Sequence, residues 1–328
     1  MSYQVRMYRV YAYRKVILVL EVDLTFPTNR IQGTFICVLS NIGGLVDGTP
    51  TIFTMEKYKR LFSTWNNFSS SVITVSYDLN EFLALAYLLM GLSALVPLAF
   101  GLRAPYGRYI RKGWGPLLDS RTAWFIQELP AFALPMILLI FTDCSQLKYL
   151  PNKIVLGIYL VHYVHRVFIY PALMKSGRAS ALMVFLCAVF FCILVGYTQG
   201  GFLLCHANFG PDWYRTPTFY VGIMLQLTGM GINIYSDHIL RSLRKPGETS
   251  VYKIPRGGLF EYVSGANFFG EILEWLGYAV ATWSFQGVAM FVSTACNIGP
   301  RAFQHHRYYK EKFEDYPVKR KALIPLII

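Results

Sequence analysis

The sequence predicts an all-α polytopic membrane protein with seven transmembrane helices. Of its 328 residues, 54% are hydrophobic and only 15% are charged, and the mean hydropathy is +0.38. This balance is too apolar for an ordinary soluble domain. Seven long apolar segments follow one another from residue 82 onward, and each can cross a bilayer, which takes about 20 helical residues.

Residues 1–80 differ from the rest of the chain, and we treat them as an N-terminal extension of unassigned structure. The apolar run at 16–20 is cut short by Glu21 and Asp23, too soon for a signal-peptide core or a span. Asn67 begins an Asn-Phe-Ser sequon, a motif that is common by chance. The membrane domain is therefore expected at 81–328.

The seven predicted spans are 82–102, 122–142, 154–173, 181–205, 217–240, 262–284 and 286–302. Almost no residues separate the last two, so this pair predicts a tight helical hairpin. Basic residues assign the orientation. Nineteen Lys and Arg lie in one set of alternate loops and only three in the other set. The basic loops are 103–121, 174–180, 241–261 and 301–321, and the other two are 143–153 and 206–216.

By the positive-inside rule the basic loops face the cytosol. The C-terminus is then cytosolic and the N-terminus lumenal. The eight basic residues within 1–80 would lie on the other side, which long translocated segments tolerate. Since the basic residues fall in these short loops, the net charge of +13 does not indicate a nucleic-acid partner.

The cysteines and histidines predict neither a redox motif nor a metal site. The six cysteines form no CxxC pair, and we interpret them as small core residues. They are Cys37, Cys144, Cys187, Cys192, Cys205 and Cys296. His305 and His306 are adjacent, and neighbouring side chains on a helix point in different directions, so a shared metal is not expected.

Polar side chains recur on single helical faces inside the predicted spans. Asn233, Asp237, Arg241 and Arg244 follow at spacings of four, four and three, and Asn267, Glu271 and Glu274 at four and three. Glu128 and the HYVHR segment at 162–166 lie at the same cytosolic depth of their own spans.

Polar groups in hydrocarbon need partners or water. We therefore predict one shared cavity, open to the cytosol, with a basic rim suited to phosphate. Arg166, inside a span, needs a counter-ion. Taken alone, each acid or amide could simply form a hydrogen bond between helices, and His162 or His165 could be a hydrogen-bonded core histidine. Their common depth favours a site. Glycines are too sparse for a GxGxxG dinucleotide turn, so a cofactor would be held by side chains between helices.

Seven motifs resemble the steroid 5α-reductases (3-oxo-5α-steroid 4-dehydrogenases). They are QELP at 127–130, HYVHR at 162–166, GMGINIYSD at 229–237, LRKPG at 243–247, IPRGGLF at 254–260, YVSGANFFGE at 262–271 and KFEDYP at 312–317. The resemblance covers roughly 103–328 and does not reach residues 1–80.

The resemblance implies a multi-pass enzyme of the endoplasmic reticulum membrane. It implies NADPH-dependent reduction of the 4,5 double bond of a 3-oxo-4-ene steroid that enters from the bilayer, with no metal. Glu128 and Tyr163 would contact the steroid ketone, and Trp124 and Trp275 would pack around the substrate or the nicotinamide. The residues implied to hold NADPH are Arg166, Arg178, Asn233, Asp237, Arg244, Tyr252, Asn267, Glu271, Arg301, His305 and Tyr309.

The physical chemistry fits this implied reaction. Hydride addition to carbon 5 places negative charge on the 3-oxygen, and a hydrogen-bond donor there lowers the barrier. Tyr163 can donate, and so can Glu128 when it is protonated. A proton must then be delivered to carbon 4.

Three residues depart from the family pattern: Tyr235 and Gln304 stand where histidines are expected, and Lys253 where an arginine is expected.

Two alternative functions stay open. One is a related membrane reductase acting on a polyprenol or an enoyl-CoA. The other is a lipid or sterol transporter or receptor, although no inverted repeat or matching pair of broken helices is visible.

Overall fold

The computed structural model describes residues 2–12, 15–25, 30–40, 75–105, 107–174, 179–243 and 253–328. Asn67, Arg178, Arg244 and Tyr252 lie outside these residues. The chain forms two compact units. One comprises Met1–Ile73 with Leu139–Asp143, and the other comprises Thr74–Leu138 with Cys144–Ile328.

The first unit contains a three-stranded antiparallel sheet in the order β1-β2-β3. Its strands are β1 (Ser2–Ala12), β2 (Lys15–Thr25) and β3 (Arg30–Ser40). Each pair is in continuous register, with Ser2 opposite Thr25 and Lys15 opposite Ser40. β-Branched and aromatic residues, which favour strands, recur along all three strands, although our reading of residues 1–80 assigned them no structure.

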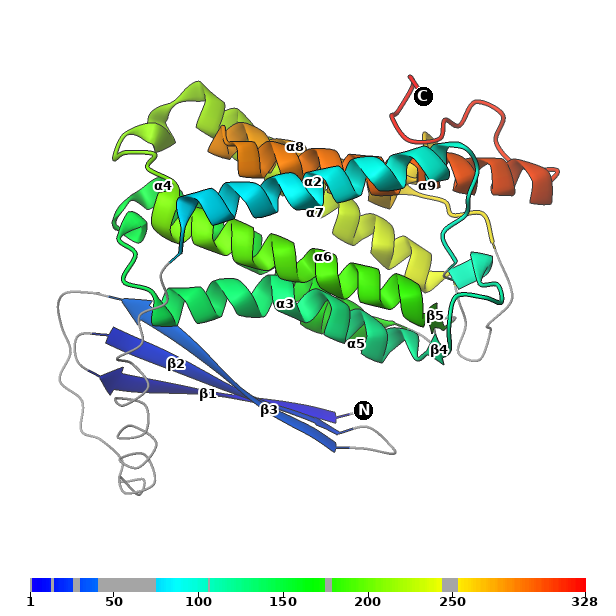
Figure 1. Ribbon diagram of the computed structural model, residues 1–328. Helices are drawn as coiled ribbons and strands as arrows, with labels where there is room; N and C mark the ends of the chain where they lie inside the picture. Colours follow the sequence, from blue (N-terminus) through cyan, green and yellow to red (C-terminus); the bar gives the residue numbers. More distant parts are fainter. Residues whose placement is uncertain are drawn as a thin grey trace. The chain divides into compact units, whose positions relative to one another are not determined.

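The second unit contains the seven predicted helical segments (Figure 1). They are α2 (Tyr77–Ala99), α3 (Ser120–Phe141), α4 (Leu150–Val164) continued by η3 (His165–Ile169) and α5 (Tyr170–Leu173), α6 (Leu182–Gly201) continued by η4 (Phe202–His206), α7 (Pro217–Ser242), α8 (Ala266–Thr282) and α9 (Phe285–Lys312). Among the described residues, four segments are long and apolar enough to cross a membrane: Tyr77–Ala99, Ser120–Phe141, Leu150–Leu173 and Leu182–His206.

The predicted hairpin between α8 and α9 turns at Trp283, whose φ of 46° is left-handed. Ser284 then caps α9, because its Oγ accepts from the Gly287 backbone N–H at 3.0 Å. The predicted last span, 286–302, lies within α9, which continues beyond it to Lys312. The residues after 302 are polar, so the hydropathy falls there. They contain no helix breaker, so the helix continues.

Helices α7 and α8 pack with their backbones almost in contact, and glycines make this possible. A Cβ built on Gly229 of α7 would lie 2.6 Å from the Glu274 Cα, and one on Gly270 of α8 would lie 2.5 Å from the Asn233 nitrogen. Small residues allow such close approach between helices. The packing fixes the polar faces of α7 and α8 against each other.

Two helical segments contain a turn of π-helix: η3 in the third span and η4 after α6. Such turns insert a residue into the helix and are frequent at functional sites. η3 carries Arg166, and η4 carries Cys205.

The interpretation of all six cysteines as core residues was wrong for Cys144 and Cys205, which form a disulfide. They are 61 residues apart in sequence, Cys144 in the loop after α3 and Cys205 in η4, so local spacing gave no sign of the pairing. Cys192 and Cys296 are buried as predicted, whereas Cys187 is exposed.

The C-terminal segment pairs with the loop that precedes α8. Lys321 donates its backbone N–H to the Tyr262 carbonyl at 2.8 Å, and its own carbonyl accepts from the Ser264 N–H at 2.9 Å. Ala322 accepts from the Gly265 N–H at 3.0 Å. The end of the chain thereby holds the start of a helix that carries predicted site residues.

Candidate active site

A cavity of about 620 Å³ lies within the helical unit. Its volume is in the range of roughly 300–1,000 Å³ that is usual for small-molecule sites. Nearly every predicted site residue that the structure describes lines it: Trp124, Glu128, Tyr163, Arg166, Asp237, Asn267, Glu271, Trp275, Arg301, His305 and Tyr309. Asn233 lies behind this wall and contacts it. Positions from five separate helical segments therefore converge on one site.

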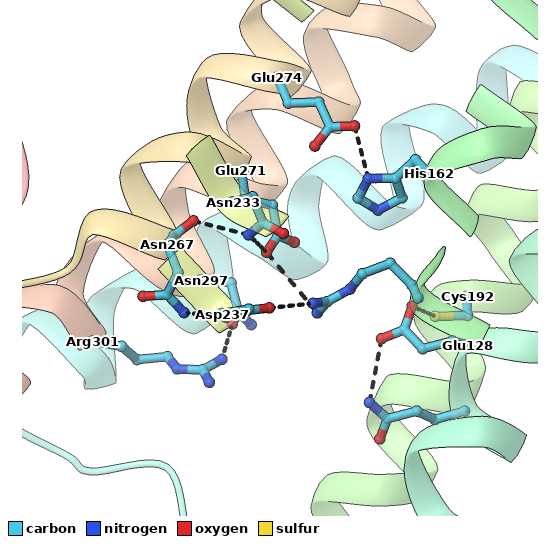
Figure 2. Close-up of polar contacts among 12 residues, drawn as sticks. Glu128, His162, Cys192, Asn233, Asp237, Asn267, Glu271, Glu274, Asn297 and Arg301 are labelled. Carbon is cyan, nitrogen blue, oxygen red and sulfur yellow. Dashed lines mark hydrogen bonds and ion pairs between the residues drawn. The ribbon is translucent and has the colours of Figure 1, made fainter. Parts of the chain in front are cut away.

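One wall is a hydrogen-bonded layer between α7 and α8. The Asn233 Nδ2 donates to the Asn267 carbonyl at 3.0 Å and to Glu271 Oε2 at 3.4 Å. In return the Asn267 Nδ2 donates to Asp237 Oδ1 at 3.2 Å. Figure 2 shows these side chains gathered between the two helices. The layer satisfies the buried amides and presents two carboxylates to the cavity.

Arg166 joins the third span to this layer. The carboxylates of the layer supply the counter-ion that was predicted for this arginine. Its guanidinium lies 3.3 Å from Asp237 Oδ2 and 4.0 Å from Glu271 Oε2. It also stacks over the Trp124 and Tyr170 rings, 4.6 and 5.0 Å from their centroids. The planar guanidinium suits this combination of carboxylate and aromatic partners.

Glu128 and Tyr163 line the same cavity from α3 and α4. Glu128 accepts from Gln127 Nε2 at 3.4 Å, and the Cys192 thiol lies 3.9 Å from its other oxygen. Tyr163 is buried, with its ring 4.7 Å from Tyr159 by centroids. An acid and a phenol thus face one cavity.

Helix α9 contributes Arg301, His305 and Tyr309, which are spaced four residues apart on one face. Arg301 donates to Asn297 Oδ1 at 3.0 Å and lies over the Phe268 ring. The His305 ring packs 5.6 Å from that of Phe268. Tyr309 is buried and stacks on Tyr316, with ring centroids 5.6 Å apart.

The cavity has the two characters that a phosphorylated cofactor and an apolar substrate require. Arg166, Arg301, His305 and Asn267 offer the positive charge and N–H donors that phosphate groups bind. The lining also includes apolar side chains from α2, α6 and α9: Met90, Ala94, Leu98, Val184, Phe191 and Met290. Among the described residues no group of three or more His, Cys, Asp or Glu is placed to hold a metal ion.

The three departures from the family pattern lie outside the cavity lining. Gln304 Nε2 donates to the Leu98 and Leu102 carbonyls, at 3.0 and 2.9 Å, and so ties α9 to the end of α2. Tyr235 is exposed, and Lys253 precedes the 254–260 loop. None of the three departures therefore alters the cavity lining.

Two clusters were not predicted as units. His162 Nδ1 lies 2.7 Å from Glu274 Oε1. Ser264, which lines the cavity, has its Oγ 2.6 Å from both His306 Nδ1 and the Tyr316 hydroxyl. Burial, and then the charges of Lys310, Arg320 and Lys321, lower the pKa of His306, which favours a neutral ring that can accept from Ser264. The sequence shows that each of these residues is polar. It does not show which of them pair, because the partners are more than 40 residues apart.

Comparison with known proteins gives one consistent result. A sequence model of the 3-oxo-5-alpha-steroid 4-dehydrogenase family matches residues 178–328. The chain is 51% identical over 223 residues to mouse 3-oxo-5-alpha-steroid 4-dehydrogenase 1, covering 68% of this chain and 87% of the mouse protein. It is 49% identical to the human protein of that name, covering 68% of this chain and 85% of the relative. It is 48% identical to human 3-oxo-5-alpha-steroid 4-dehydrogenase 2, covering 72% and 93%.

Proposed function

Because the chain belongs to the steroid 5α-reductase family, and is thus an oxidoreductase, we propose that it uses NADPH to reduce the 4,5 double bond of 3-oxo-4-ene steroids to 5α-reduced 3-oxosteroids. One observation carries this proposal. Glu128 and Tyr163 share a single cavity with cationic and amide side chains and with apolar side chains.

NADPH supplies a hydride when bound, and the chain's own residues hold it and orient it. We assign its binding to Arg166, Asn233, Asp237, Asn267, Glu271, Arg301, His305 and Tyr309, together with Arg178, Arg244 and Tyr252 outside the described residues. Arginines bind phosphate oxygens through paired N–H donors. The Asn233–Asn267 layer keeps the carboxylates and amides of this wall in place.

Glu128 and Tyr163 act on the steroid ketone. Hydride addition to carbon 5 moves negative charge onto the 3-oxygen, and donors already aimed at that atom stabilise the charge. The Tyr163 hydroxyl is one donor, and Glu128 in its protonated form is the other. Trp124 and Trp275 pack along the flat ring system of the substrate or the nicotinamide.

We further propose that residues 81–328 form a seven-span reductase domain in the endoplasmic reticulum membrane, preceded by an extension at 1–80. In this topology the C-terminus is cytosolic and the N-terminus lumenal. NADPH reaches the cavity from the cytosol and the steroid from the bilayer. The disulfide supports the topology. Cys144 and Cys205 lie at the two loops with few basic residues, and disulfides form in an oxidising lumen.

The test is expression in microsomes with NADPH and testosterone or progesterone, followed by mass spectrometry. A product heavier by two hydrogens supports the proposal. Parallel incubations with a polyprenol and an enoyl-CoA separate the related reductases. A carrier or receptor would show no NADPH oxidation that depends on added steroid, and that result would contradict the proposal.

A further inference from the structure

His162 and Glu274 form a buried pair at the edge of the cavity. His162 Nδ1 lies 2.7 Å from Glu274 Oε1, and the two residues are 4% and 0% exposed. Figure 2 shows the pair apart from the Asn233–Asn267 cluster. His162 lines the cavity, whereas Glu274 lies behind it and does not. Removing a carboxyl group and an imidazole from water is costly, and none of the binding roles assigned above explains this pair.

The contact with Glu274 occupies Nδ1 of His162 and leaves Nε2 as the ring nitrogen available to a ligand. One proton is shared between Glu274 Oε1 and His162 Nδ1, on whichever partner it resides. If it resides on Glu274, Nδ1 accepts it, and the neutral ring has its own hydrogen on Nε2. If it resides on Nδ1, either the ring is an imidazolium with a hydrogen on Nε2 as well, or the ring is neutral with a bare Nε2 and the pair carries one net negative charge. In the two arrangements without net charge, which the burial of this pair favours, Nε2 is an N–H donor, and loss of that proton leaves a neutral ring bound to a carboxylate.

This donor lies beside the proposed ketone-binding group. The His162 ring centroid is 4.9 Å from that of Tyr163 and 4.8 Å from that of Trp275. Both neighbours line the cavity. In a 3-oxo-4-ene steroid, carbon 4 is bonded to carbon 3, which bears the ketone oxygen. A ketone held by Tyr163 therefore places carbon 4 near the same part of the wall.

We propose that His162 is the catalytic acid that protonates carbon 4 and that Glu274 is its positioning residue. This rests on the proposed function above, because it supplies the proton which that reaction requires. After hydride reaches carbon 5, the enolate forms a C4–H bond as the His162 Nε2–H bond breaks. The electron pair of that N–H bond stays on the imidazole, the enolate collapses to the ketone, and water returns the proton to His162.

The other charged groups of the cavity have different partners. Asp237 and Glu271 face Arg166 from α7 and α8, and Glu128 accepts from Gln127. Arg301 is bonded to Asn297, on the α9 side of the cavity. A carboxylate–imidazole couple holds a proton ready for transfer, as in other enzymes where an acid orients a histidine. No comparable couple among the described residues faces Tyr163.

The experiment follows hydrogen exchange at carbon 4 in the absence of NADPH turnover. A 5α-reduced 3-oxosteroid is incubated in D₂O with the membrane-embedded wild-type protein, with and without NADP⁺, and deuterium at carbon 4 is measured by mass spectrometry. The wild type should speed this exchange above the uncatalysed rate. The exchange rate of His162→Gln should be at least about 100-fold below that of the wild type. The rate of Glu274→Gln should fall less, because its amide can still orient the ring.

A matched control comes from the same segment. His165 is a buried histidine one turn later that does not line the cavity, and His165→Gln should exchange at the wild-type rate. NADPH affinity is measured for every variant by equilibrium binding, and unchanged affinity shows that the fold is intact. If His162→Gln fails to fold, Glu274→Gln with wild-type affinity decides the question.

The outcomes separate this inference from the proposed function. Steroid reduction by the wild type tests the function alone. Two results would overturn the His162 assignment and leave the function standing when reduction is observed. In one, the wild type does not speed exchange at carbon 4. In the other, folded His162→Gln and Glu274→Gln exchange at the wild-type rate.

Discussion

Gly229 of α7 lies directly against the backbone of Glu274 of α8, with 2.6 Å between a Cβ built on the glycine and the Glu274 Cα. One helical turn further along, Asn233 donates to the Asn267 carbonyl. The closeness of the two backbones is thus what allows the amide layer of the cavity wall to form.

Replacing Gly229 should therefore disrupt the cofactor wall. Gly229→Leu would force α7 from α8, because the atoms it meets are backbone. We expect NADPH affinity to fall at least tenfold and thermal stability to drop, as overpacking costs about 1–3 kcal/mol. Gly231→Ala is the control, since nothing lies within 4 Å of a Cβ at Gly231. Equal affinity in Gly229→Leu and the wild type would show that this contact does not support binding.

Glu128→Gln and Tyr163→Phe should preserve NADPH binding and lose most turnover. Each change removes a donor to the developing oxyanion, which typically costs about 100- to 1,000-fold in rate. Single-turnover steroid reduction and equilibrium NADPH binding measure the two effects separately. Tyr159→Phe is the control, because Tyr159 donates to the Ala131 carbonyl and does not line the cavity. Full activity in both Glu128→Gln and Tyr163→Phe would refute their assignment.

The Cys144–Cys205 disulfide should stabilise the protein without taking part in catalysis. It closes a loop of 61 residues, which the chain-entropy account values at up to about 4 kcal/mol, and neither cysteine lines the cavity. Cys144→Ser should lower the unfolding temperature in detergent and keep the rate of steroid reduction. Reductant should lower the unfolding temperature of the wild type and of Cys296→Ala, but not that of Cys144→Ser. A wild type that is insensitive to reductant would contradict the prediction.

Glu261 should make stability depend on pH in the acid range. The Gly257 backbone N–H donates to its carboxylate at 2.6 Å, and this bond, followed by Arg320 and Arg256, lowers the pKa of Glu261 below its ordinary value of 4.5. Because the folded-state pKa is the lower one, the stabilisation is complete above about pH 4.5 and is lost as the pH falls through the folded value.

This pH dependence is measurable by thermal unfolding in detergent at pH 7 and at pH 4 and below. On acidification the wild type should lose more stability than Glu261→Gln. Glu314→Gln, a change at an exposed carboxylate, should behave like the wild type. Parallel losses in the wild type and Glu261→Gln would show that Glu261 does not carry the effect.

Helices and polar faces were predictable because both depend on spacing along the chain. Asn233 and Asp237 share a face wherever the helix lies, and Arg166 within a span demanded a counter-ion. The identity of that partner, Asp237, depends on packing between segments 71 residues apart. The π-helical turn that carries Arg166, the Cys144–Cys205 bond and the His162–Glu274 pair are likewise set by contacts between distant segments, which periodicity does not encode.

The pairing of Lys321 with Tyr262 and Ser264 has a consequence for how this protein is made. A chain is synthesised from its N-terminus, so the loop before α8 emerges well before residue 321 exists. Ser264 cannot gain its contacts with Tyr316 and Lys321 until residue 321 has been added. Assembly of this side of the cavity is therefore completed only after residue 321 has been synthesised.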